Sequence, residues 1–299
     1  MYTLLLVGMM GLNMAVDFMD RRTVQRGDFY ALALWTMIIQ FLLILPLIGL
    51  VKAMPIEAYV LCALVGFYSA FSRVSWYRAI SAHGQTLSRL SPFLRLSSVI
   101  SLGCAFFLLG EPFTYVKGLG GLLMIGGSLL MTLDNPAESI RKFIEYNRAA
   151  VLVLMTAIST ASIAVSYKYL MNGGVDLFSI FFFLKLFQML AMLSLHMKGR
   201  SLAMSYRRIL HLRLLVTGRF FQTVASLIYM TVLSHLELST VEPIASLSPL
   251  MLLGVELTGY AFRRDKATAA AMNWNRRTIV VRAISLTFVG AGVYLMNRS

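Results

Sequence analysis

The stretch KGLGGLLMIGGSLLM, residues 117–131, has no charged side chain after its first residue. A helix of a soluble protein keeps a polar stripe toward water, and this stretch has none. Similar runs recur along the 299-residue chain, of which 58% is hydrophobic and only 13% is charged. A soluble domain has about 25% charged residues. The composition therefore predicts an integral membrane protein.

Long apolar runs indicate that the membrane is crossed by helices. Lipid tolerates only helices or closed barrels, and barrel strands alternate polar and apolar residues over about ten positions. Here the runs are continuous and close to the roughly 20 residues that a spanning helix needs. We therefore predict an all-α protein with ten transmembrane helices, near residues 3–19, 29–51, 56–79, 86–110, 113–133, 149–170, 177–196, 213–235, 238–262 and 279–297.

The motifs of common enzyme and metal sites are missing from the sequence. It has no phosphate-binding loop, no zinc-spaced histidines and no nucleophile elbow. Both cysteines, Cys62 and Cys104, fall inside predicted spans, where they are expected to be small packing residues. We therefore expect no cofactor, no metal and no enzymatic activity.

The formal net charge of +14 is concentrated in the loops on one side of the predicted bundle. Cytoplasmic loops are enriched in Lys and Arg, so this side is predicted to be cytoplasmic and both termini to lie outside. The excess is explained by topology, so we expect no nucleic-acid partner. The predicted location is the bacterial inner (plasma) membrane, as a multi-pass protein. The cations on the basic side are Arg21, Arg22, Arg26, Arg141, Lys142, Arg148, Lys198, Arg200, Arg207, Arg208, Arg213, Arg263, Arg264, Lys266, Arg276 and Arg277, against Lys52, Lys117 and Arg298 on the other.

An internal repeat divides the chain into two halves. WYRAISAHGQTLSRLS (76–91) aligns with IYMTVLSHLELSTVEP (228–243) at an offset of 152, which places Tyr77 on Tyr229. The opening stretch aligns with RAISLTFVGAGVYLM (282–296) at an offset of 165, so thirteen extra residues lie between the ninth and tenth helices. MAVDFM at 14–19 also aligns with IAVSYK at 163–168.

These alignments predict two repeats of five helices each. Residues 1–133 form the first repeat, 134–148 a basic linker, and 149–299 the second repeat with its insertion. Because five is odd, the second repeat enters the membrane from the opposite face. Such inverted-topology repeats are the usual construction of alternating-access transporters.

Two motifs resemble a known family. FFLLGEPFTYVKGLGGLLMIGGSLLM (106–131) resembles the end of an EamA repeat in the drug/metabolite transporter superfamily, where a Leu-Gly-Glu turn precedes a glycine-rich fifth helix. VEPIASLSPLMLL (241–253) resembles the proline-bearing fourth helix of such a repeat. The second repeat departs from the pattern, because it has FRRDKA where the first has LGEPFT.

The resemblance implies a substrate cavity between the repeats. Its walls would be the third, fourth, eighth and ninth helices, and the fifth and tenth helices would pack at the back. The glycines of 117–131 and 282–296 agree with that last point, because small residues let helices approach closely.

Ionisable residues inside the spans are the candidate site. A charge in lipid normally faces a partner or a cavity. Four deep cations, Arg73, Arg95, Lys185 and Arg219, stand against Asp17, Glu242 and Glu256. Either the charges pair structurally, for example Arg95 with Glu256, or surplus cations meet an anionic substrate. The predicted substrate-binding residues are Arg73, Tyr77, Arg95, Lys185, Arg219, Tyr229, Glu242 and Glu256.

Two functions remain open. The first is a secondary transporter that moves a small organic metabolite bearing a carboxylate or phosphate, by alternating access and without ATP. The second is a flippase for a lipid-linked phosphate or sugar. In either case the partners are a small-molecule or lipid-linked substrate and the membrane lipid, with coupling to protons or another ion open. The chain is expected to act as a monomer or homodimer.

Overall fold

The computed structural model describes residues 2–24, 29–83, 94, 96–132, 147–196, 212–247 and 276–296. Each of the ten predicted spans overlaps one of its α-helices, and several helices extend beyond the predicted bounds; a 3₁₀ turn, η1, continues α2. The elements are α1 (Tyr2–Val24), α2 (Phe29–Ile44), η1 (Leu45–Leu50), α3 (Ile56–His83), α5 (Leu96–Phe107), α6 (Tyr115–Thr132), α8 (Asn147–Asn172), α9 (Leu177–His196), α11 (Leu212–His235), α12 (Leu238–Ala245) and α15 (Arg276–Met296).

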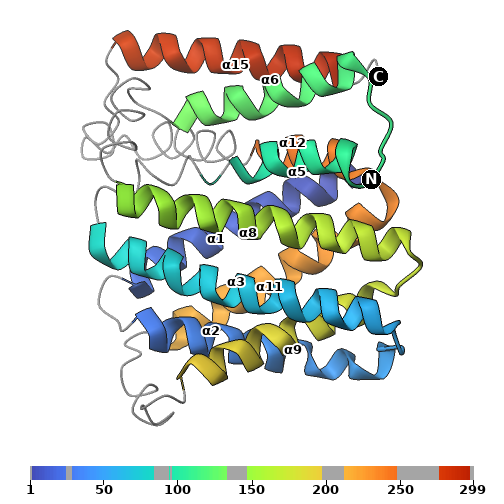
Figure 1. Cartoon of the computed structure of the whole chain (residues 1–299). Coiled ribbons are helices and arrows are strands. Elements are labelled where there is room, and N and C mark those ends of the chain that lie inside the picture. The colour runs from blue at the N-terminus through green and yellow to red at the C-terminus, as the bar shows by residue number, and fades with distance from the viewer. Residues whose placement is uncertain are drawn as a thin grey trace.

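The helices form a bundle in which both chain ends lie at one end (Figure 1). We call this the terminal end, and the rings of Tyr2 and His235 stack there with centroids 5.1 Å apart. α1 runs away from the terminal end, whereas α8 runs toward it (Figure 1). The first helix of each predicted repeat therefore crosses the bundle in the opposite direction.

Several described helices have the length and hydropathy of membrane spans. Four of them meet both criteria over Tyr30–Leu50, Ile56–Arg78, Val151–Asn172 and Leu177–Leu195, and shorter apolar helices cover parts of α1, α5, α6 and α15. α11 is as long as these spans, but Arg219 and Gln222 lower its hydropathy. An integral, multi-pass membrane protein is the class that these helices fit.

Helix pairs from the two halves of the chain make most of the bundle. α1 packs on α11, α3 packs on α8 and α9, α2 packs on α9, and α6 packs on α15. The α6–α15 pair lies along one edge of the bundle, and α2 and α9 lie along the opposite edge (Figure 1).

Glycines at the α6–α15 contact allow a close approach. A Cβ added at Gly127 would lie 2.8 Å from the carbonyl oxygen of Ser285, and one at Gly292 would lie 2.7 Å from that of Gly120. At Gly126 and Gly290 an added Cβ would meet no atom within 4 Å. The predicted packing role is thus confirmed for Gly127 and Gly292, and it does not extend to every glycine of the two helices.

Gly127→Leu is expected to lower the melting temperature and the yield of folded protein in detergent, because overpacking costs about 1–3 kcal/mol. Gly126→Leu is the matched control, since it makes the same change one residue away in open space. Thermal unfolding of both purified variants measures the effect. Equal melting temperatures would contradict the assignment of Gly127 to the helix contact.

Candidate functional site

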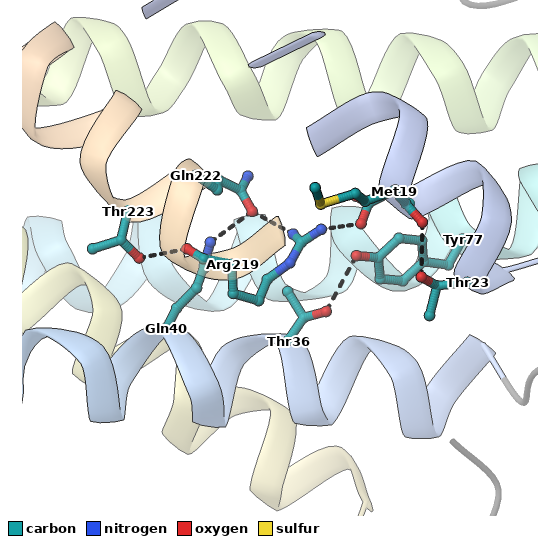
Figure 2. A network of polar contacts seen from close by, with 9 residues as sticks. Met19, Thr23, Thr36, Gln40, Tyr77, Arg219, Gln222 and Thr223 are labelled. Carbon is teal, nitrogen blue, oxygen red and sulfur yellow. Dashed lines mark hydrogen bonds and ion pairs between the residues drawn. The ribbon is translucent and has the colours of Figure 1, made fainter. Parts of the chain in front are cut away.

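The most deeply buried charge in the described part of the chain is the guanidinium of Arg219 on α11. The whole residue has 0% exposure. Figure 2 shows the Arg219 guanidinium among its polar neighbours, with Gln222 beside it. Arg219 forms an ion pair with Asp20 on α1, whose exposure is 7%. A buried arginine needs such a partner, because removing an ion from water costs several kcal/mol. The pair joins the first helix of one half of the chain to a helix of the other half.

Two amide side chains continue the network from Arg219. Gln222 Oε1 accepts hydrogen bonds from the Arg219 guanidinium and, at 2.7 Å, from Gln40 Nε2 on α2. Gln40 Oε1 accepts a hydrogen bond from Lys185 Nζ on α9 at 3.2 Å. We call this set, Asp20, Arg219, Gln222, Gln40 and Lys185, the amide chain. It connects α1, α11, α2 and α9.

Helix α3 adds two more predicted residues to this region. The hydroxyl groups of Tyr77 and Thr36 are 3.2 Å apart, and Tyr77 is fully buried within the electrostatic influence of Arg219 and Asp20. Arg73 is half-buried, one turn before Tyr77, and its charge acts on both Tyr77 and Lys185. No described side chain forms an ion pair or hydrogen bond with Arg73.

The balance of charge in this region is positive. Among the described side chains, Arg73, Lys185 and Arg219 contribute three cations, and Asp20 is the carboxylate that faces them. Lys185 is 9% exposed, and its ammonium also lies 5.8 Å from the centre of the Phe181 ring. The Asp20 carboxylate pairs with Arg219, and the other two cations have no carboxylate partner among the side chains that the structure describes.

A second polar cluster lies at the terminal end and serves the ends of helices. Glu111, from the Leu-Gly-Glu turn, accepts hydrogen bonds from the backbone N–H groups of Leu238 and Ser239 at 2.7 and 2.9 Å. It thereby caps the N-terminus of α12, where backbone donors have no partner within the helix. Lys168 Nζ donates to the carbonyl oxygens of Leu233 and Leu236 at the end of α11.

Tyr229 and Glu242 belong to this second cluster. The Tyr229 hydroxyl donates to Glu242 Oε1 at 2.5 Å, and Glu242 is 8% exposed, on the short helix that Glu111 caps. Tyr229 is ten residues beyond Arg219 on α11, which is about 15 Å along the helix axis. The two clusters are therefore separate.

The eight predicted site residues thus divide into three groups. Arg73, Tyr77, Lys185 and Arg219 lie together around the amide chain. Tyr229 and Glu242 contact each other at the other cluster. Arg95 and Glu256 lie outside the described residues. The side chain of Asp17, which is not one of the eight, also lies outside them.

Sequence reasoning missed Asp20, Gln40 and Gln222. Asp20 precedes two arginines and was expected in the loop after the first span, but α1 continues to Val24 and carries its carboxylate into the bundle. Gln40 and Gln222 are uncharged, so a survey of ionisable residues passes over them. An amide inside a long apolar run is the signal that would have found them, because a buried polar group needs a hydrogen-bond partner.

Comparison with known proteins finds a family match for the first part of the chain. Residues 2–133 match the model of the EamA-like transporter family. The match covers somewhat less than half of the chain. It confirms the resemblance to EamA-type transporters of the drug/metabolite transporter superfamily that residues 106–131 predict.

A solved crystal structure shares the fold of the whole chain. It superimposes with a TM-score of 0.65 at 14% sequence identity. The superposition covers 100% of this chain and 99% of the other. At this identity the likeness concerns the fold alone. No curated protein matches the sequence.

The Arg219–Asp20 pair is expected to stabilise the bundle. Arg219→Met leaves a buried carboxylate without its cation, and breaking a buried pair in this way costs about 3–5 kcal/mol. The double variant with Asp20→Asn is expected to recover most of the lost stability. Melting temperatures of both single variants and the double variant measure this, and purely additive losses would show that the pair is not coupled.

Proposed function

We propose that this EamA-like protein is a secondary transporter that moves a small organic anion, bearing a carboxylate or phosphate, by alternating access. The observation that carries the proposal is the surplus of positive charge around the amide chain, where Arg73 and Lys185 have no carboxylate partner among the described side chains. Surplus buried cations are costly unless an anion joins them. A substrate carboxylate or phosphate supplies that anion.

The arrangement of helices supports alternating access. We propose two five-helix repeats of inverted topology, residues 1–133 and 149–299, joined by the basic linker 134–148. The contacts of α1 with α11 correspond to those of α8 with α3 when the two repeats are exchanged, and α2–α9 and α6–α15 are pairs of equivalent helices. Such a pseudo-twofold arrangement lets one repeat rock against the other around a fixed site.

The proposed binding residues are Arg73 on α3 and Lys185 on α9. An arginine binds a planar carboxylate or phosphate through two parallel N–H groups, and a lysine adds a compact point charge. Arg219 serves chiefly to hold α11 against α1, because Asp20 already neutralises it. The predicted lining by the third, fourth, eighth and ninth helices remains part of the proposal, and Arg95 and Glu256 are its further candidate residues.

Anion binding tests the proposal. Purified protein is titrated with pyruvate, succinate, 3-phosphoglycerate and glutamate, with choline and glucose as cationic and neutral controls, and uptake of the tightest binder is then measured in proteoliposomes. Lys185→Gln and Arg73→Gln are each expected to weaken binding about 10–100-fold, because a hydrogen bond to a charged group contributes about 1.5–3 kcal/mol.

Lys52→Gln is the matched control for charge. It also removes one cation, but the Lys52 side chain is 76% exposed, beside Asp176 at the terminal end. It is expected to bind and transport as the wild type does. Binding of choline in preference to every anion would overturn the proposal, and binding of lipid phosphates alone would favour a flippase.

The proposed topology places the basic loops in the cytoplasm of a bacterium and both termini outside. A single cysteine at Tyr2 is then expected to react with a membrane-impermeant maleimide in intact cells, whereas one at Ser201 reacts only after permeabilisation. The parent for both is a variant in which Cys62 and Cys104 are replaced by alanine. Labelling of the Ser201 position in intact cells would reverse the orientation.

A further inference from the structure

The direction of the hydrogen bonds through Gln40 and Gln222 is fixed by the two cations that flank these amides, Lys185 and Arg219. Lys185 only donates, so Gln40 must present its oxygen to the ammonium, and its nitrogen then faces Gln222. Gln222 in turn must present its oxygen, and Arg219, which also only donates, bonds to that same oxygen. Both ends therefore agree on one arrangement of the two amides.

This arrangement leaves hydrogen-bond donors that no described acceptor takes up. The oxygens of Gln40 and Gln222 accept hydrogen bonds from within the amide chain, and Asp20 Oδ1 accepts one from Arg219. Gln222 Nε2 and the remaining N–H groups of Lys185 have no acceptor among the described residues. Figure 2 shows the Gln222 nitrogen on the side away from Arg219, and the residue is half-buried.

We propose that the Gln222 amide nitrogen is a substrate-binding donor beside Lys185 and Arg73, and that Gln40 is the residue that positions both Gln222 and Lys185 for this purpose. The inference rests on the proposed function and names the chemistry that the site selects. The unused polar atoms of Gln222 and Lys185 are donors, so they match a group that only accepts hydrogen bonds. An ionised carboxylate or a phosphate is such a group.

The same geometry explains what the site rejects. An ammonium group or a hydroxyl-rich neutral molecule brings donors, and at Gln222 Nε2 and Lys185 Nζ these would face donors. A donor placed against donors leaves both without partners, which is costly in a buried site. Selection against cations therefore follows from hydrogen bonding as well as from charge.

The test changes Gln222 and measures the affinity for the tightest-binding anion of the set pyruvate, succinate, 3-phosphoglycerate and glutamate. Gln222→Met removes the N–H groups at similar side-chain length, and about tenfold weaker binding is expected. Gln222→Glu keeps an oxygen for Arg219 and Gln40 but replaces the donor with a negative acceptor. Its anion affinity is expected to fall by more than about 100-fold, although its fold is maintained by a stronger bond to Arg219.

Gln188→Met is the matched control. Like Gln222→Met, it removes one side-chain amide, in this case from α9. The Gln188 amide donates to Ser69 at 2.8 Å and is not part of the amide chain. Its anion affinity is expected to equal that of the wild type. Gln40→Met is expected to weaken binding, and Gln40→Glu, which still offers an oxygen to Lys185 but no donor to Gln222, is expected to restore little of it.

The outcomes separate the two proposals. If no anion binds the wild-type protein, the proposed function fails and this inference fails with it. If the wild type binds and Lys185→Gln does not, while Gln222→Met and Gln222→Glu bind as the wild type does, the transporter proposal stands and the role of Gln222 is wrong. Loss of affinity in both Gln222 variants with normal binding in Gln188→Met supports the inference.

Discussion

The buried guanidinium of Arg219 constrains how the helices in the middle of this bundle pack. Arg219 has 0% exposure, and neither lipid nor apolar side chains can solvate its charge. Asp20 supplies the compensating charge, and it does so because α1 extends to Val24 and brings the carboxylate beside α11. The packing of α1 on α11 and the direction of the adjoining hydrogen bonds both depend on this pair.

The terminal end is organised by a related constraint, which is that backbone groups at helix ends need partners. Glu111 meets it for the N-terminus of α12, and Lys168 meets it for the C-terminus of α11. The Leu-Gly-Glu turn thus has a structural task in this protein, because its carboxylate accepts hydrogen bonds from a helix of the other half of the chain. Lys117 and Glu237 form an ion pair beside it.

The two clusters differ in which of their described polar groups are available to bind a substrate. At the terminal end, described charges are engaged with helix ends, with each other or with Tyr229. Around the amide chain, the donors of Gln222 and Lys185 remain, and two cations have no carboxylate partner among the described side chains. This difference is why the proposed substrate site lies at Arg73, Lys185 and Gln222, and why Tyr229 and Glu242 are better explained by the architecture.

Local properties of the sequence predicted the membrane class, the approximate positions of the described helices and the close packing at Gly127, because hydropathy and small-residue spacing act over a few turns. They also carried the resemblance to the family that residues 2–133 match. The sequence did not predict the partners of the buried charges, because these partners lie far apart along the chain. Asp20 and Arg219 are 199 residues apart, Gln40 and Gln222 are 182 apart, and Gln40 and Lys185 are 145 apart. Each contact depends on which way a helix is rotated about its axis. A nearly uniform apolar span carries little information on that rotation, so only the packing of the whole bundle decides which polar side chains meet.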